Sequence, residues 1–490
     1  MEKKDIDLLD YEKQESTVST THENQYDELG NKEYTVTAAE RSLVRKLDFI
    51  YVMPFVAILN FLQYFDKSSL NYAGVLHIKE DTGIDDAQYS WLGSIFYLGY
   101  LLFQVPNAIL IQRIPLSKYV GGLIVLWGAV LICTSEGKNF SQLAALRFLL
   151  GFFEAGIYPC CIMLISTMYR RPEQAGRIGL VYICNGLAMS VGGLVSYGIG
   201  HMDGAGGKSA WQWIMIILGA VTVLFGVICF FLLVDQPKSR FLRLTPEQEK
   251  AVEVRLLDNN VIRTNKVKIS HMVEALKEPR FYCFIFASLL LNVQNGALGI
   301  FSAIITAGFG FSNLEAILLG VPSGIVDCLY IIIAVWFNRR YGHTLYLAAF
   351  LPCISSLGLL LLVTIPMPQA KLLGLYLCWA TPAAYTMFLA SISNNVSGYS
   401  KKIFYSCSIM VTYTIGNFIG PLIMVGWQKP LYLGGMIGAI GANTVATILV
   451  LITRYLMAKS NRERLANPKP EVDQNEDLTD RENPNFIYRL

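Results

Sequence analysis

Apolar stretches long enough to cross a lipid bilayer recur about twelve times along this chain, and they limit its fold more than any other feature. A segment in hydrocarbon must satisfy its backbone hydrogen bonds internally, and stretches of this length do so as helices. We therefore predict an all-α integral membrane protein with twelve transmembrane helices. The predicted spans lie near residues 48–73, 88–111, 117–136, 140–168, 177–200, 211–234, 280–305, 313–337, 343–365, 371–394, 402–427 and 431–456.

A polar, basic section interrupts the spans after the sixth one and predicts a division into two six-helix bundles. Within it, Thr245-Pro246-Glu247-Gln248 has the residue order of a helix N-cap, so we expect a short surface helix to begin there. Both ends of the chain are polar and charged, which predicts disordered tails. The predicted organisation is an N-terminal tail over 1–46, bundles over 47–234 and 280–457, a central loop over 235–279 and a C-terminal tail over 458–490.

Composition and motifs exclude several classes of protein. Hydrophobic residues make up 53% of the sequence and charged residues 16%, whereas soluble domains carry about 25% charged residues. Most of the ten cysteines lie inside apolar runs without metal-ligand spacing, so we expect buried thiols and neither a metal nor a cofactor. The sequence contains no Walker A, GxSxG or HExxH motif, and we therefore expect no enzyme.

Lysine and arginine are distributed asymmetrically between the two sets of loops. If both termini are cytoplasmic, the inner loops hold most of the basic residues and the first outer loop is acidic, as the positive-inside rule requires. The inner basic residues are Arg113, Lys118, Arg170, Arg171, Arg177, Arg339, Arg340, Lys401 and Lys402. Inside termini also agree with an even number of spans.

Arg147 and Glu154 are charged residues inside the apolar fourth span. They are seven residues apart, so on a helix they share nearly one face and lie roughly 10 Å apart along the axis. A charge in hydrocarbon costs on the order of 3 kcal/mol and therefore faces a partner, the bundle interior or water. Two interpretations stay open: a structural salt bridge to neighbouring helices, or an anion site with a protonatable carboxylate beside it.

The first span holds a second charged pair, Asp66 and Lys67. Adjacent residues point about 100° apart on a helix, so the two side chains do not simply neutralise each other on one face. Either Lys67 extends to water at the outer end of the helix or both residues face a buried site. Polar residues at Tyr100, Gln104 and Asn107 form a stripe on the second span that suits a cavity or an interhelical hydrogen-bond seam.

The eleventh span contains Asn417 within Gly416-Asn417-Phe418-Ile419-Gly420-Pro421. A Gly/Pro interruption in the middle of a span can kink a helix and expose its backbone, so we rank Asn417 above the other polar residues of the second half. Those others include Asn292 and Asn295 in the seventh span and Asp327 in the eighth, whose position relative to a cavity is left open.

Several motifs occur together in this order. They are DKSSLNYA at 66–73, Gly99-Tyr100 with Gln104-Val105-Pro106, RFLLGFFEAGIYP at 147–159, WQWI at 211–214, NNVSG at 394–398, and Gly416-Asn417 with Gly420-Pro421. In this combination the chain resembles the major facilitator superfamily (MFS), and within it the anion:cation symporter family in its fungal allantoate-permease-like branch. The resemblance covers about residues 45–460.

The resemblance implies an MFS fold of two pseudo-symmetric six-helix bundles with a cavity at the membrane midplane. It implies proton-coupling sites at Asp66 and Glu154, an anion site at Arg147 and Lys67, and further substrate-binding positions at Tyr64, Tyr100 and Asn417. Lys67 stands where the family usually has arginine.

From the residues and the resemblance together we expect a secondary active transporter that imports a small organic anion with protons by alternating access. The anion is expected to be a carboxylate-type vitamin, a ureide or a related nitrogen compound. The alternatives are an organic-anion exporter or exchanger, and a non-transporting nutrient sensor with a transporter fold. We expect a multi-pass monomer in the plasma membrane, with the endoplasmic reticulum or another internal membrane as the alternative. Its expected partners are the anion, protons and lipid, and no nucleic acid.

Overall fold

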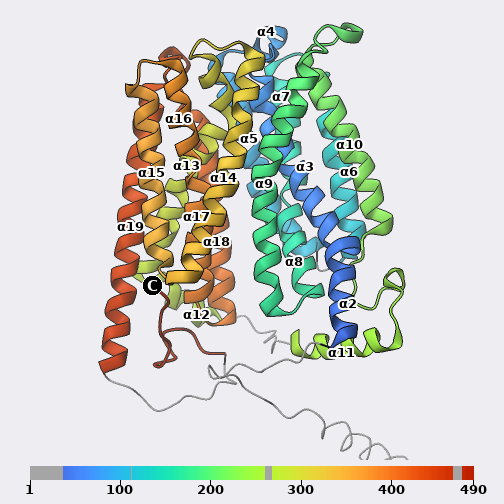
Figure 1. Ribbon diagram of the computed structural model, residues 1–490, viewed down its shortest axis with the longest axis vertical. Helices are drawn as coiled ribbons and strands as arrows, with labels where there is room; N and C mark the ends of the chain where they lie inside the picture. The colour runs from blue at the N-terminus through green and yellow to red at the C-terminus, as the bar shows by residue number, and fades with distance from the viewer. Residues whose placement is uncertain (1–36, 112, 260–267, 467–476) are drawn as a thin grey trace, which may run out of the picture.

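The computed structural model describes residues 37–111, 113–259, 268–466 and 477–490, and its helices form two bundles side by side (Figure 1). The first bundle contains α3 (Met53–Ala73), α5 (Asp86–Leu110), α6 (Leu116–Thr134), α7 (Phe140–Glu154) with α8 (Ile157–Met168), α9 (Arg171–Gly200) and α10 (Ala210–Leu232). The second contains α13 (Pro279–Ala307), α14 (Asn313–Tyr341), α15 (Thr344–Thr364), α16 (Pro368–Cys378) with α17 (Thr381–Asn395), α18 (Tyr399–Leu422) and α19 (Leu433–Ala466). The predicted all-α fold is confirmed.

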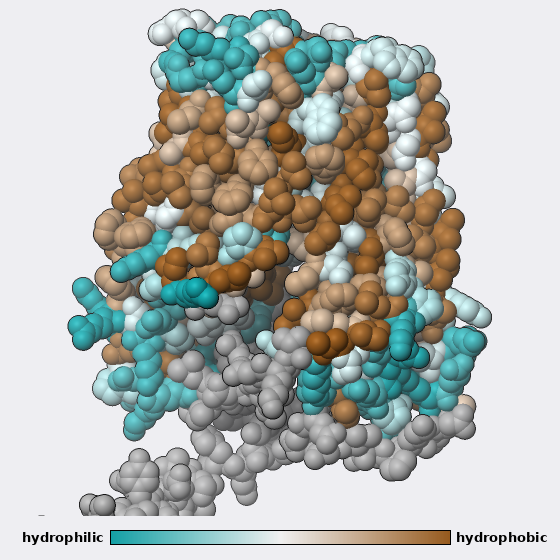
Figure 2. All heavy atoms as spheres, turned by 180° about the vertical axis from the view of Figure 1, so that it is seen from behind, coloured by the Kyte–Doolittle hydropathy of each residue, from teal (hydrophilic) through white to brown (hydrophobic). Residues whose placement is uncertain are grey.

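Eleven spans of the described chain are long and apolar enough to cross a membrane, counting α7–α8 and α16–α17 as one span each. The twelfth is α3, whose mean hydropathy is lowered by polar residues that include Asp66 and Lys67. Because α3 packs against α9, α10 and α13, these polar residues face protein and not lipid. Figure 2 shows the resulting surface, a broad apolar band between two polar ends.

Two spans contain helix breaks, and neither break is at the Gly/Pro segment around Asn417 that the sequence suggested. The fourth span breaks at Ala155–Gly156, between α7 and α8, and the tenth breaks at Trp379–Ala380, between α16 and α17. The predicted interruption around Asn417 is wrong, because α18 continues as one helix through Leu422. Gly416 and Gly420 instead let α18 lie against the backbone of α13, where an added Cβ would meet the carbonyl oxygens of Leu289 and Val293 within 2.4 Å.

The two bundles contact each other through α5 with α18, α9 with α14, and α3 with α13. The closest approach is between α9 and α14: a Cβ added at Gly324 would lie 2.2 Å from the carbonyl oxygen of Gly186. Glycine is required at this crossing because no side chain fits between the two backbones. Gly186 belongs to the fifth predicted span, 177–200, and it allows close packing of that helix.

The two ends of the molecule differ. One end carries α4 (Ile78–Thr82) and is called the α4 end; the other carries α2 (Ala38–Lys46), α11 (Pro246–Asn259) and α12 (Ile269–Leu276) and is called the α11 end (Figure 1). Short turns lie at Leu47–Tyr51, Ala205–Gly207, Arg240–Leu242 and Gly426–Gln428. The helix predicted to begin at Thr245 is α11, whose Thr245 and Gln248 cap each other.

Hydrogen bonds join the bundles at the α4 end. Ser90 donates to the carbonyl oxygen of Met424 at 3.4 Å, and Lys429 lies 2.5 Å from Asp86. Asn71 donates to Ser302 at 2.8 Å. At the α11 end, Figure 2 shows the surface hollowed between the two bundles. The structure is therefore closed at the α4 end.

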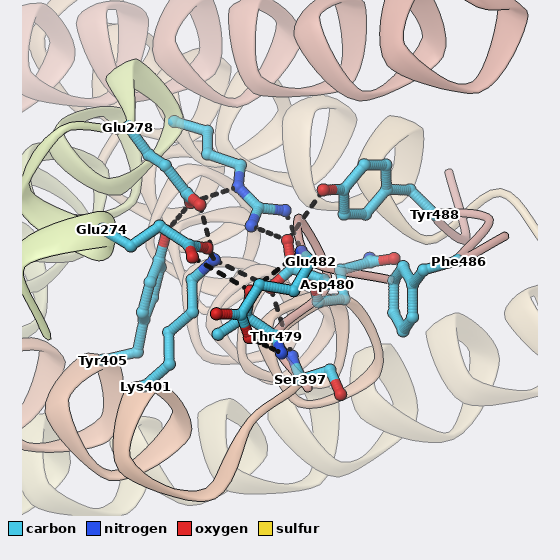
Figure 3. A network of polar contacts seen from close by, with 12 residues as sticks. Glu274, Glu278, Ser397, Lys401, Tyr405, Thr479, Asp480, Glu482, Phe486 and Tyr488 are labelled. Atoms are coloured by element: carbon cyan, nitrogen blue, oxygen red, sulfur yellow. Dashed lines mark hydrogen bonds and ion pairs between the residues drawn. The ribbon is translucent and has the colours of Figure 1, made fainter. Parts of the chain in front are cut away.

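The C-terminal segment 477–490 is packed on the second bundle, so the prediction of disorder from 458 onward is wrong for this segment. The helix α19 itself runs to Ala466 and not to 457. Asp480 and Lys401 have no exposed surface and lie 3.0 Å apart, and Asp480 also pairs with Arg280. Figure 3 shows these groups converging with Glu278 and other residues from α12, α13 and α18. The N-terminal residues 1–36 lie outside the described residues.

Candidate functional site

Three charged residues of the first bundle lie buried at mid-membrane depth. Asp66 on α3 has no exposed surface, and Arg147 and Glu154 on α7 are 3% and 2% exposed. Arg147 and Glu154 share a face of α7, as predicted, and both lie within electrostatic reach of Asp66. The predicted charge cluster therefore forms, built from α3 and α7.

Asp66 is held in place by two donors. The indole Nε1 of Trp127 on α6 donates to one carboxylate oxygen, and the Ser69 hydroxyl donates to the other at 3.4 Å. These bonds fix the carboxylate toward α6, and no described lysine or arginine lies within 4.0 Å of it.

Arg147 and Glu154 each keep a free polar atom. Nη2 of Arg147 and Oε2 of Glu154 are buried and have no hydrogen-bond partner among the described protein atoms. The structure contains no carboxylate oxygen within 4.0 Å of Arg147 in its described part, so the interpretation of this residue as a structural salt bridge is not supported. Glu154 makes a hydrogen bond to Gln63 on α3. A buried donor without a protein partner is costly, so Nη2 of Arg147 is available to water, an ion or a bound ligand.

Lys67 extends into the protein and not to the outer water. Its Nζ donates to the Tyr413 hydroxyl at 3.3 Å and lies 5.0 Å from the ring centre of Tyr97 and 5.7 Å from that of Tyr413. Aromatic faces stabilise an ammonium ion without neutralising it. Because Tyr413 belongs to α18, Lys67 joins the first bundle to the second.

Asn417 is the centre of an amide network between the bundles. Its Oδ1 accepts from Tyr97 at 3.3 Å and from Asn295 at 2.8 Å. Its Nδ2 donates to Asn292 Oδ1 at 3.2 Å and to the carbonyl oxygen of Tyr413 at 2.9 Å. Asn417, Tyr413 and Tyr97 therefore connect Lys67 to α13, and the two α13 asparagines belong to the site.

Two more tyrosines that the sequence predicted, Tyr64 of α3 and Tyr100 of α5, lie near this group. Tyr64 and Tyr100 are both within electrostatic reach of Lys67, and Tyr100 is also within reach of Glu154. In the rest of the predicted polar stripe on α5, Asn107 accepts a hydrogen bond from Tyr119 of α6 at 2.7 Å, whereas Nε2 of Gln104 is buried without a partner among the described protein atoms. Only Tyr100 of that stripe joins the charged cluster.

The sequence interpretation did not identify Tyr97, Trp127 and Tyr413 as site residues. Tyr97 and Tyr413 carry a periodic signal that was available, because each precedes a predicted site residue on its own helix, Tyr100 and Asn417, by about one turn. Trp127 lies in an apolar run of α6, and its contact with Asp66 depends on how α6 packs against α3. No feature of the neighbouring sequence indicates that Trp127 contacts a charged residue.

The arrangement provides two cations and two carboxyl groups in one region. Arg147 offers a planar guanidinium with an unused donor, and Lys67 offers an ammonium that lies against the Tyr97 and Tyr413 rings and donates to the Tyr413 hydroxyl. Together they suit an anionic group. Asp66 and Glu154 lie beside these cations and can each hold a proton or a negative charge.

The sequence matches the model of the Major Facilitator Superfamily over residues 56–421. The allantoate permease of Saccharomyces cerevisiae is 31% identical over 484 residues, covering 94% of this chain and 88% of that protein. The thiamine pathway transporter THI73 of the same yeast is 30% identical over 452 residues, covering 91% and 86% of the two chains.

A solved structure has the same fold. A bacterial homologue of the human lysosomal transporter Spinster, in an inward-facing and occupied conformation, matches with a TM-score of 0.65 at 14% identity, covering 89% of this chain and 100% of that chain. At this identity the match concerns the fold alone. With the matches over nearly the whole chain, this protein is a membrane transporter of the Major Facilitator Superfamily, in its allantoate-permease-like branch.

Proposed function

We propose that this protein imports a small organic anion together with protons, by alternating access. The anion is a carboxylate-type vitamin, a ureide or a related nitrogen compound. The observation that carries the proposal is the pair of unpartnered buried atoms, Arg147 Nη2 and Glu154 Oε2, placed within electrostatic reach of Asp66. The names of the relatives, an allantoate permease and a thiamine pathway transporter, support the substrate class.

The anion would bind to Arg147 first. Its free Nη2 donor is buried, so a carboxylate that accepts from it replaces an unsatisfied group by a charge-assisted hydrogen bond. Lys67 would supply the second cation, and its link to Tyr413 makes it sensitive to the position of α18. Anion binding would therefore affect contacts of both bundles.

Protons would be carried by Asp66 and Glu154. A substrate anion engages the same cations that favour the ionised forms of these carboxyl groups, so binding of the anion and of protons should support each other. This reciprocity is the thermodynamic requirement of symport. Glu154 has the more direct role, because Trp127 and Ser69 hold Asp66 while Glu154 keeps a free oxygen.

The distribution of basic residues supports a cytoplasmic α11 end. Arg113 follows α5 at this end, Lys118 lies in the first turn of α6, and Arg339 and Arg340 lie in the last turn of α14. The acidic loop around α4 lies at the other end. With this orientation the structure is open to the cytoplasm and closed to the outside. Both termini are then cytoplasmic, in the plasma membrane or an internal one.

The experiment is uptake into proteoliposomes that hold the purified protein, with allantoate and a panel of carboxylate vitamins and ureides as radiolabelled probes. An imposed pH gradient, acidic outside, should drive accumulation of about tenfold per pH unit if one proton accompanies each monoanion. A protonophore should abolish it.

Other outcomes would contradict this proposal. Accumulation driven by a gradient of a second anion, with no response to pH, would make the protein an exchanger. Saturable binding of a probe without flux would make it a sensor. Arg147→Ala serves as the matched control, because it removes the anion donor and leaves both proposed proton carriers in place.

A further inference from the structure

A further charged residue inside a membrane span, Asp327, lies outside the cluster of Asp66, Lys67, Arg147 and Glu154 that the proposed function uses. It stands in the middle of α14, is 3% exposed, and its Oδ1 has no hydrogen-bond partner among the described protein atoms. It also forms no ion pair of 4.0 Å or less with a described residue. A buried carboxylate without a cation is costly, and protonation removes that cost.

Asp327 is placed where the two bundles approach most closely. A Cβ added at Gly186 of α9 would lie 3.3 Å from Asp327 Oδ2 and 2.7 Å from the carbonyl oxygen of Gly324. One turn further toward the α4 end, Ser190 of α9 donates to the carbonyl oxygen of Val321 at 2.8 Å. Any parting of α9 from α14 therefore changes the surroundings of this carboxyl group directly.

The groups that face Asp327 from the packed helices are weakly polar. Tyr64 of α3 and Cys328 of α14 itself lie within electrostatic reach of it, and Cys184 of α9 lies within reach of Cys328. From α13, α15, α16 and α17, which also pack against α14, no described lysine, arginine, histidine, aspartate or glutamate lies within that reach. Protonation of Asp327 therefore has no described salt bridge to break.

A small cavity lies one turn of α14 from Asp327, on the side of the α4 end, and is lined in part by polar side chains. Its volume is about 30 Å³, which is room for about two water molecules. Its lining includes Tyr64, Ser323 and Trp379, and the Ser323 hydroxyl and the Trp379 indole nitrogen are both buried without a protein partner. Ser323 precedes Asp327 by four residues, so the two share a face of α14. Unpartnered donors in a cavity of this size favour hydration, and a water molecule bound to Ser323 would extend from Asp327 toward the α4 end.

We propose that Asp327 is a further proton-binding site of this transporter, protonated while α9 and α14 are in contact and exchanging its proton through the cavity at Ser323 and Trp379. Ionisation of Asp327 then favours the conformation in which α9 and α14 part at the α4 end. The inference rests on the proposed proton-coupled alternating access, and it adds a carboxyl group from the second bundle to the two of the first.

The test measures the opening of the α4 end in the full-length protein in lipid nanodiscs, without substrate. Spin labels are attached through a genetically encoded ketone amino acid at Ala205 and Gln369, two exposed positions of the two bundles at the α4 end, so the ten cysteines stay unchanged. Double electron–electron resonance then gives the open and closed populations between pH 5 and pH 9. The Asp66→Asn/Glu154→Gln variant is the background, because it removes the two other proposed proton carriers.

In this background the ratio of open to closed molecules should rise at least tenfold between pH 5 and pH 9. Adding Asp327→Asn should reduce the change to less than twofold and keep the closed distance at every pH. Asp327→Glu should restore the pH dependence of the ratio of open to closed molecules. The same variant tests the inference if the asparagine variant does not fold. Glu315→Gln is the control: it neutralises an exposed carboxyl group of the same helix, and glutamine preserves the capping box with Ser312.

An unchanged pH response after Asp327→Asn would overturn the inference, and so would a background variant that shows no pH response. The result is separable from that of the uptake assay. A pH response that depends on Asp327, in a protein that accumulates no probe with protons, would contradict the proposed function and leave the titration of Asp327 standing. Proton-driven uptake without a pH response that depends on Asp327 would support the proposed function and contradict the role of Asp327.

Discussion

Lys401 and Asp480 form a fully buried ion pair of 3.0 Å between α18 and the last residues of the chain. Lys401 also pairs with Glu274 of α12 at 2.7 Å and with Glu278 at 2.5 Å. The pair thus fastens the segment 477–490, here called the C-terminal segment, to the α11 end of the second bundle. Removal of one partner of a buried pair leaves the other charge uncompensated, which typically costs about 3–5 kcal/mol.

Asp480→Asn should release the C-terminal segment. Because Arg280 and Lys401 keep Glu278 as a partner, we expect the low end of that range, about 3 kcal/mol, or roughly a hundredfold in the opening equilibrium. Hydrogen–deuterium exchange of the segment measures this change. Glu482→Gln is the matched control, since that side chain is exposed and glutamine can still accept the bond from the Thr479 backbone. Equal protection in Asp480→Asn and the wild type would show that the ion pair does not hold the segment.

Acid should release the same segment. Burial raises the pKa of Asp480, but the charges of Arg280 and Lys401 lower it by more, so the pKa lies below its ordinary value. A lowered pKa means that the pair stabilises docking fully above the ordinary aspartate pKa of about 4, and that this stabilisation is lost as the pH falls through the lowered value. Fluorescence anisotropy of a label at the exposed Ile487 measures the release. Unchanged anisotropy as the pH falls would show that the charge of Asp480 does not hold the segment.

Arg147→Ala should abolish binding of the transported anion, and Arg147→Lys should weaken it because the planar fork is lost. At about 6 Å and an effective dielectric constant near 20, a charge pair contributes roughly 3 kcal/mol, or about a hundredfold in affinity. Equilibrium binding of the best probe from the uptake panel measures both variants. An alanine variant that reaches the membrane with near wild-type affinity would show that Arg147 is structural.

Glu154→Gln should separate exchange from accumulation. Glutamine resembles the protonated carboxyl group, so the variant should still exchange internal for external substrate while losing proton-driven accumulation. Counterflow and gradient-driven uptake in the same proteoliposomes measure the two activities. Gln63→Ala is a matched control, because it removes the bond to Glu154 and leaves the carboxyl group in place. Persistent pH-driven accumulation in Glu154→Gln would leave Asp66 as the carrier in the first bundle.

The orientation predicts which cysteine labels react from outside the cell. A cysteine at Glu80, in α4, should react with an impermeant reagent in intact cells. A cysteine at Glu247, in α11, should react only after permeabilisation. Labelling of position 247 from outside would reverse the orientation and place the hollow of the α11 end on the outer side.

The sequence alone was sufficient to predict the spans, the two bundles and the charged residues inside the membrane. These follow from local properties, since length and hydropathy identify a spanning helix and a charge such as Arg147 stands out against an apolar run. The shared face of Arg147 and Glu154 also follows from helical periodicity alone. The residue pattern also singled out Tyr100 and Asn417, and the resemblance to known transporters added Tyr64. Tyr64 and Tyr100 lie within electrostatic reach of Lys67.

The packing of the helices determines which of these groups contact one another. The bond from Trp127 to Asp66, the contact of Lys67 with Tyr413 and the docking of Asp480 on Lys401 join residues far apart in the sequence, and they depend on how helices pack. The charged C-terminal segment has the composition of a disordered tail, and only its pairing with buried cations gives it a fixed place. Asp327 is a further example. The sequence identifies it as a charge inside a span. Its closeness to Gly186, with no described cation paired to it, results from the crossing of α9 and α14.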